Sequence, residues 1–143
     1  MLISNMDDEA AQFDALSALI DEAKDIAVCA HTSPDGDAIG STLALAEIIE
    51  AGWEGKRVCV LLADDDVVPR TYRFLPGLER LTHVADYDVD PDLFICVDLS
   101  DKTRLNEAQL VLERSSKVGV LDHHPSGEKF WDAGVVRTGA AAA

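Results

Sequence analysis

Four short apolar runs constrain the fold of this chain more than any other feature of its sequence. They cover residues 26–30 (IAVCA), 56–62 (KRVCVLL), 93–97 (LFICV) and 117–121 (KVGVL). Their apolar residues follow one another directly, which is typical of strands buried on both faces. Segments with helical periodicity separate several of these runs. We therefore expect an α/β fold: a mostly parallel central sheet with helices on both faces.

The loop after the first run, residues 31–41 (HTSPDGDAIGS), combines one imidazole with two carboxylates. Pro34 and Gly36 favour a sharp turn, and Gly36 lets Asp35 and Asp37 turn toward one point. Two close carboxylates repel each other unless a proton or a cation lies between them. Oxygen ligands beside a histidine nitrogen suit manganese, magnesium or zinc. The loop also enters a helix N-terminus, which favours phosphate. Taken alone, the loop at 31–41 fits an ordinary polar turn with a helix cap as well as it fits a metal and phosphate site.

Two later strands also end in residues that can bind metals. Asp98 follows the run at 93–97, and Asp122, His123 and His124 follow the run at 117–121. Sites in parallel α/β sheets form outside the carboxyl ends of the strands. The three clusters are therefore expected to converge, although they are far apart in the sequence.

Such a set of carboxylates and imidazoles matches the needs of two metal ions. Carboxylates can bridge two cations ~3.5–4 Å apart, and such a pair activates a water and clamps a phosphoryl group during in-line displacement. No protein nucleophile is required. Each of the three cysteines, Cys29, Cys59 and Cys96, lies inside an apolar run.

The charge and composition of the chain limit which molecules it can bind. The 143 residues, about one domain, carry a formal charge of −15 from 27 acidic and 12 basic residues. Binding of long nucleic acids needs basic patches, so this domain is not expected to grip them. A small anionic substrate can still bind where a metal supplies positive charge. We expect a cytoplasmic protein with reduced thiols, because no signal peptide is visible and no apolar run approaches the ~20 residues of a membrane span.

The motifs His31-x-x-Pro-Asp-Gly-Asp-Ala-x-Gly-Ser41, Val97-Asp98 and Asp122-His123-His124 resemble those of the DHH phosphoesterase superfamily, in that family's order. The resemblance covers roughly residues 20–143 and implies a Rossmann-like DHH domain. The sequence around Asp98 looks most like the branch of oligoribonucleases that also act as 3′-phosphoadenosine 5′-phosphate phosphatases.

This resemblance implies a metal ligand set. His31 and Asp35 are expected to hold one manganese ion. Asp37 and His123 are expected to hold a second, and Asp98 to bridge the two. Magnesium or another divalent metal is an alternative.

The resemblance also implies catalytic and substrate-binding roles. His124 is expected to contact the scissile phosphate, either polarising it or protonating the leaving oxygen, and Asp122 to orient the site. Gly40 and Ser41 are expected where the helix N-terminus meets a phosphate oxygen. Arg104 is expected to neutralise substrate charge, with a surface salt bridge as an equally good alternative.

The family carries a further metal-binding aspartate and a C-terminal substrate domain, for which residues 1–143 offer no counterpart. We therefore expect a DHH catalytic domain truncated at its C-terminus. The expected function is hydrolysis of short oligonucleotides or small nucleotide phosphates by a metal-activated water. The alternatives are a cyclic-dinucleotide phosphodiesterase, an inorganic pyrophosphatase, or a non-catalytic module that binds metal or nucleotide. No membrane partner is expected, and the oligomeric state stays open.

Local patterns predict the remaining elements. Residues 1–6 are expected to be loose and residues 7–24 to form a helix capped by Asp7 or Asp8. Further expectations are helices at 38–50 and 107–114, with Leu110 and Val111 facing inward, a helical turn within 69–76 and a short strand at 81–84. Asp64, Asp65 and Asp66 are expected in a solvated loop, and residues 139–143 to begin an interrupted helix.

Overall fold

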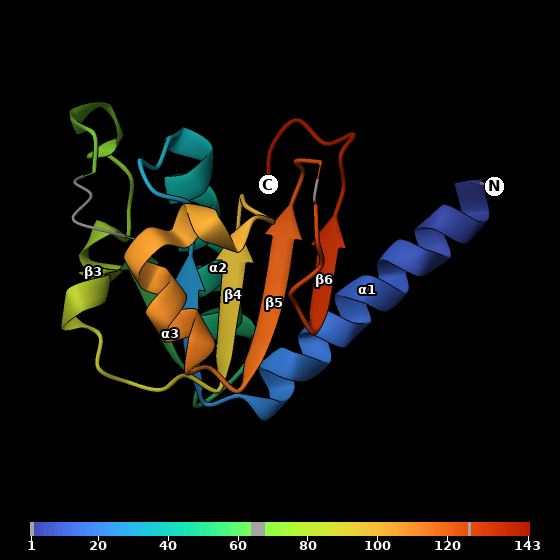
Figure 1. The fold of residues 1–143 in the computed structure, drawn as a ribbon, viewed down its shortest axis with the longest axis horizontal. Helices are drawn as coiled ribbons and strands as arrows, with labels where there is room; N and C mark the ends of the chain where they lie inside the picture. The colour runs from blue at the N-terminus through green and yellow to red at the C-terminus, as the bar shows by residue number, and fades with distance from the viewer. Residues whose placement is uncertain (1, 64–67, 126) are drawn as a thin grey trace.

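The computed structural model describes residues 2–63, 68–125 and 127–143. Within them a six-stranded sheet has the order β3-β2-β1-β4-β5-β6, and every neighbouring pair is parallel (Figure 1). The strands are β1 (Asp25–Cys29), β2 (Arg57–Leu62), β3 (Leu81–His83), β4 (Leu93–Val97), β5 (Lys117–Asp122) and β6 (Ala133–Val136). The helices are α1 (Leu2–Glu22), α2 (Gly36–Gly52) and α3 (Gln109–Glu113). The 3-10 segments are η1 (Arg70–Tyr72), η2 (Leu78–Arg80), η3 (Val84–Asp86) and η4 (Lys102–Ala108).

The predicted α/β fold, with a parallel sheet covered on both faces, is confirmed. Phe94 packs on one face with Val111 of α3, and the next residue, Ile95, packs on the other with Ile20 of α1 and Ile39 of α2. Successive side chains of a strand point to opposite faces, so continuous apolar runs are what two covered faces require. The strand order is that of Rossmann-like folds.

The predicted start of α1 is wrong. The helix begins at Leu2 rather than near residue 7, and in Figure 1 its N-terminal part extends past the edge strand β6. Residues 2–6 contain no glycine or proline that would stop a helix. The expectation of a loose segment overlooked this, and the proposed Asp7 or Asp8 cap lies within the helix.

The expected helix at 107–114 is also corrected. The chain becomes helical earlier, because the Asp101 side chain accepts a hydrogen bond from the Thr103 backbone N–H and starts η4. Val111 is buried as expected, but Leu110 is 65% exposed. Strand β6 was not predicted, since its four residues include a glycine and give little strand signal.

The strand at 81–84 is confirmed as β3, and a helical turn within 69–76 as η1. Phe74, which follows this turn, is 78% exposed. The tail does not begin a helix at residues 139–143 but forms a turn and a bend. Asp64, Asp65 and Asp66 lie outside the described residues.

Within the described residues, Cys29, Cys59 and Cys96 form no disulfide bond. Among the described residues no helix is long and apolar enough to cross a membrane.

Gly119 of β5 tests the contact between α1 and the sheet. An added Cβ would lie 2.6 Å from Leu16 Cδ1 of α1, so helix and strand are in direct contact there. Gly119→Val is expected to lower the free energy of unfolding by ~1–3 kcal/mol through overpacking, measured by urea denaturation. Gly52→Ala is the matched control, because no atom lies within 4 Å of its added Cβ. Equal stability of the two variants would contradict this packing.

Candidate metal centre

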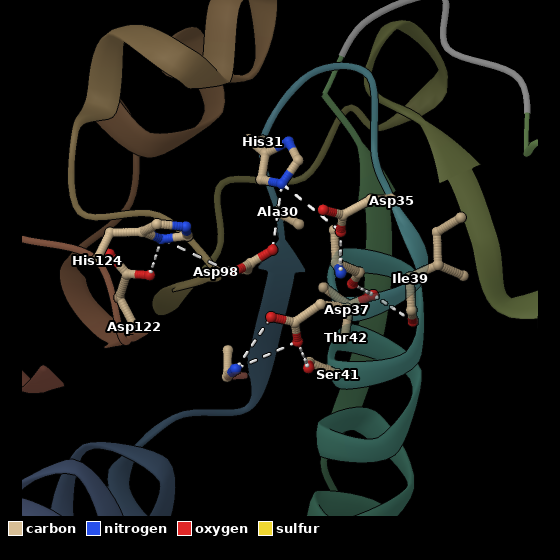
Figure 2. A network of polar contacts seen from close by, with 12 residues as sticks. Ala30, His31, Asp35, Asp37, Ile39, Ser41, Thr42, Asp98, Asp122 and His124 are labelled. Atoms are coloured by element: carbon tan, nitrogen blue, oxygen red, sulfur yellow. Dashed lines mark hydrogen bonds and ion pairs between the residues drawn. The ribbon is translucent and has the colours of Figure 1, made fainter. Parts of the chain in front are cut away.

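The carboxyl ends of β1, β4 and β5, three neighbours in the sheet, bring the predicted clusters together. His31 follows β1, Asp98 directly follows β4, and His123 directly follows β5. His31 Nε2 lies 3.2 Å from Asp98 Oδ2, and His123 Nε2 lies 3.0 Å from Asp98 Oδ1. The expected convergence is therefore present, and Figure 2 shows the Asp98 carboxylate between His31 and His124.

Asp98 is held at the tip of β4 by its own backbone. Its N–H donates to the Leu121 carbonyl at 2.9 Å, so it still pairs with β5. Its φ of 64° is left-handed, a conformation that aspartate adopts more readily than most residues. This turn leaves the carboxylate buried, with its side chain 2% exposed. Burial raises the pKa of Asp98, and the negative charge of Asp37 raises it further.

Asp37 approaches the same point from the first turn of α2. Its Oδ2 lies 3.2 Å from His123 Nε2, and its Oδ1 accepts a hydrogen bond of 2.7 Å from Ser41 Oγ. Burial raises the pKa of Asp37, but hydrogen bonds from Ser41 and from the Ala143 N–H outweigh burial, and the net effect lowers it. Asp37 is therefore held as an anion beside the buried Asp98.

The imidazoles of His31 and His123 share one orientation. His31 Nδ1–H donates to the Thr32 carbonyl at 2.8 Å, and His123 Nδ1–H donates to the Ala140 carbonyl at 3.2 Å. A carbonyl only accepts, so in the neutral ring Nε2 carries the lone pair. Nε2 of both rings faces the Asp98 carboxylate. Two acceptors at this distance repel unless a proton or a cation lies between them.

These donors fit a pair of divalent cations. Two groups of potential ligands occur within the described residues: His31, Asp35 and Asp98 form one, and Asp98, Asp122, His123 and His124 form the other. Within each group the ligand atoms lie within 4.8 Å of one another. Asp98 belongs to both groups, which is what a bridging carboxylate requires. Imidazole with carboxylate suits manganese, zinc and related metals.

Asp35 serves the local structure as well as the cluster. Its Oδ1 accepts a hydrogen bond of 2.9 Å from the Ala38 N–H and caps α2, while the same oxygen lies 4.0 Å from His31 Nε2. The ordinary-cap interpretation of the loop is therefore correct for this residue. It does not exclude a ligand role, because the side chain is 62% exposed and Oδ2 is not part of the cap.

Asp122 and His124 form a pair beside the cluster. His124 Nδ1–H donates to Asp122 Oδ1 at 2.7 Å, which leaves His124 Nε2 available on a ring that is 43% exposed. Asp122 Oδ2 is buried, and it accepts no hydrogen bond from any described residue. This contact agrees with an orienting role for Asp122, which is a common arrangement around metal centres.

The predicted substrate-binding residues are placed differently from what the sequence suggested. Gly40 and Ser41 lie in the second turn of α2, so their N–H groups bond within the helix and cannot contact phosphate. The Ser41 hydroxyl is directed at Asp37. Arg104 is exposed and lies within 4.0 Å of no carboxylate that the structure describes, so its salt-bridge alternative is not observed there. Its carbonyl accepts from the Thr32 N–H at 3.0 Å and joins the two loops.

The tail contacts were missed at the sequence level. The Ala140 carbonyl fixes the His123 ring, and the Ala143 N–H contacts both oxygens of Asp37 at 3.2 and 3.1 Å. These are backbone contacts from a run of small residues, which carries no side-chain signal.

Ser41→Ala tests whether this residue supports the metal centre or contacts substrate. Losing the hydroxyl removes a hydrogen bond to Asp37 and is expected to weaken manganese binding ~10-fold, measured by equilibrium titration. Fold stability should not fall, because alanine favours helices. Unchanged manganese affinity with a lower kcat/KM would instead support the substrate contact.

Known proteins that resemble this chain match it over the segment that contains the cluster. The model of the DHH family, N-terminal domain, matches residues 25–140. The chain is 28% identical over 131 residues to a probable bifunctional oligoribonuclease and PAP phosphatase, NrnA, of Streptococcus mutans, covering 92% of this chain and 39% of that protein. It is 27% identical over 126 residues to the cyclic-di-AMP phosphodiesterase PdeA of Listeria monocytogenes, covering 81% of this chain and 19% of that protein.

The fold has a solved counterpart, an exopolyphosphatase-related protein from Bacteroides fragilis. The two structures match with a TM-score of 0.82 and a sequence identity of 24%. The match covers 93% of this chain and 40% of that chain. The chain thus spans about two fifths or less of the length of these relatives. Because the family model covers most of the chain, from the first strand to the tail, the protein belongs to the DHH family through its N-terminal domain.

Proposed function

We propose that this chain is the catalytic domain of a manganese-dependent phosphoesterase that hydrolyses short oligonucleotides or small nucleotide phosphates. The observation that carries the proposal is the buried Asp98, whose two carboxylate oxygens each face the Nε2 of a different histidine. Family membership supports the general phosphoesterase activity. The identity of the metal as manganese, the substrate and a cytoplasmic location are our proposals.

The chain offers ligands for two metal ions. His31 and Asp35 would hold one ion, and His123 and Asp37 the other. Asp98 would bridge them. When bound, such a pair lowers the pKa of water and neutralises the charge of phosphate oxygens. The surrounding protein keeps these ligands oriented through the Thr32 and Ala140 carbonyls and Ser41.

His124 is suited to the proton transfer that breaking the ester bond requires. Its Nε2 is free to meet the leaving oxygen, and its Nδ1–H is held by Asp122. A protonated His124 would be stabilised by that carboxylate and could donate from Nε2 to the leaving oxygen. Asp122 would then act as a positioning residue.

The relatives suggest two alternative substrate classes. The similarity to NrnA of Streptococcus mutans favours short oligonucleotides and 3′-phosphoadenosine 5′-phosphate, and the similarity to PdeA favours a cyclic dinucleotide. We favour the first because the sequence around Asp98 and Arg104 resembles that branch. Release of mononucleotide from a dinucleotide, compared with hydrolysis of cyclic-di-AMP and of pyrophosphate, separates the alternatives.

Asp98→Asn is expected to abolish activity in the full-length protein. An amide cannot bridge two cations as a carboxylate does, so manganese-dependent hydrolysis of a dinucleotide should fall more than ~100-fold. Binding should fall from two manganese ions to one or none. Asp88→Asn is the control, with the same chemical change at an exposed position outside the cluster. Wild-type activity of Asp98→Asn would refute the proposal, and one bound ion without turnover in the unmodified protein would favour a binding module.

Asp122→Asn tests the positioning role separately. The amide still contacts the His124 ring but stabilises the protonated ring less, so kcat should fall ~10–100-fold while the manganese stoichiometry stays the same. His123→Ala should instead reduce manganese binding. Loss of metal in Asp122→Asn would show that Asp122 is itself a ligand.

A further inference from the structure

The space above Gly36 is filled by the ring of Tyr72, a residue that the proposed reaction does not use. A Cβ added at Gly36 would lie 3.0 Å from Cε1, 3.2 Å from Cζ and 3.4 Å from Oη of Tyr72. The φ of Gly36 lies outside the left-handed region, so its backbone conformation does not require a glycine. The glycine is therefore explained by the volume that the Tyr72 ring occupies.

Gly36 stands between two of the proposed metal ligands. Asp35 caps α2, Asp37 belongs to the first turn of that helix, and both carboxylates lie at its N-terminal end (Figure 2). Because Gly36 is joined covalently to both residues, a shift of its backbone moves both carboxylates. Close contact with the Tyr72 ring therefore restricts where this turn can lie.

Tyr72 is itself held by the turn that carries it and by the core. Its N–H donates to the Pro69 carbonyl at 2.9 Å, and its carbonyl accepts from the Leu75 N–H at 3.1 Å. The ring packs against the core cluster that contains Ile39 of α2. The contact with Gly36 thus connects a hydrogen-bonded turn and the core to the metal-binding loop.

The same segment is fixed along the whole of α2. Arg80 Nη1 lies 2.5 Å from Glu50 Oε2, which belongs to the last turn of that helix. Between the two ends, Leu75 and Leu78 pack against the core cluster that includes Leu43 of α2. The segment and α2 are therefore joined from the first turn of the helix to its last, so the ring cannot move away from Gly36 independently.

We propose that Tyr72 is a positioning residue of the metal centre, whose ring holds the turn of Asp35, Gly36 and Asp37 where both carboxylates can meet the metal ions. The inference rests on the proposed function, because the ions are those assigned there. The closest contacts are made by ring carbons, so the ring rather than the hydroxyl carries the effect. Tyr72 acts through the turn and needs no contact with substrate.

The first test measures manganese affinity of the full-length protein by equilibrium titration. Tyr72→Ala should bind manganese ~10-fold more weakly, as is usual when a residue that supports metal ligands is lost. Tyr72→Phe keeps the ring and should bind manganese as the unmodified protein does.

Tyr87→Ala is the matched control for lost aromatic packing. Tyr87 is also partly buried and packs against the core, but it lies beside Asp25 and Arg57, where β1 and β2 begin. This variant should lose stability without a change in manganese affinity. The proposal is overturned by unchanged affinity in Tyr72→Ala, by an equal loss in Tyr87→Ala, or by an equal loss in Tyr72→Phe.

The second test measures the stability of the metal-free protein by urea denaturation. Alanine favours a helix more than glycine does, so Gly36→Ala should raise the denaturation midpoint in the Tyr72→Ala background, where the added methyl group has room. With Tyr72 present, the ring opposes the methyl group and the midpoint should not rise. Equal shifts in the two backgrounds would show that the ring does not constrain Gly36, and would overturn the proposal.

The role of Tyr72 and the proposed function fail in different ways. If the unmodified protein binds no manganese, the proposed function is wrong, and the role of Tyr72 toward the metal is wrong with it. If the unmodified protein binds manganese and Tyr72→Ala binds it equally well, only the role of Tyr72 is wrong.

Discussion

The contacts between the buried Asp98 carboxylate and the two imidazoles that face it are the constraint on which the site depends. Each ring donates its Nδ1–H to a backbone carbonyl, so Nε2 faces the carboxylate and needs a proton or a cation between the two acceptors. Burying a carboxylate is costly unless it is paired or bound to a metal. The chain places Asp98 there through a left-handed backbone turn and a continued hydrogen bond to β5. A proton or a cation between these groups stabilises the arrangement, and the ligand set fits a cation.

The sheet makes this arrangement possible, because it places three strand ends side by side. β1, β4 and β5 are consecutive in space although β2 and β3 come between β1 and β4 in the sequence. Their apolar side chains form both halves of the core, with Phe94 on one face and Ile95 on the other. The cost of burying a carboxylate at the strand tips is thereby offset by a well-packed sheet below them.

Several residues of the site serve structure and chemistry together. Asp35 caps α2 and lies near His31, and Ser41 is a helical residue whose hydroxyl holds Asp37. The tail adds a carbonyl to His123 and an N–H to Asp37. The orientation of the potential ligands thus comes from a helix, loops and the tail at once.

The sequence by itself determined the parallel α/β fold and which strand ends carry potential ligands, because continuous apolar runs and the residues after them are local features. It also left a helix cap in the loop at 31–41 as an alternative, and Asp35 provides that cap. It did not determine that Asp98 faces two histidines, that Ser41 is directed at Asp37 rather than at solvent, or that the tail returns to the site. These contacts join residues far apart in the chain, so packing decides them. The error at Leu110 has the same origin: this apolar residue was expected to face inward but is exposed, since burial depends on which elements lie opposite it. Only the tertiary structure places His31 and His123 against the two oxygens of one buried carboxylate.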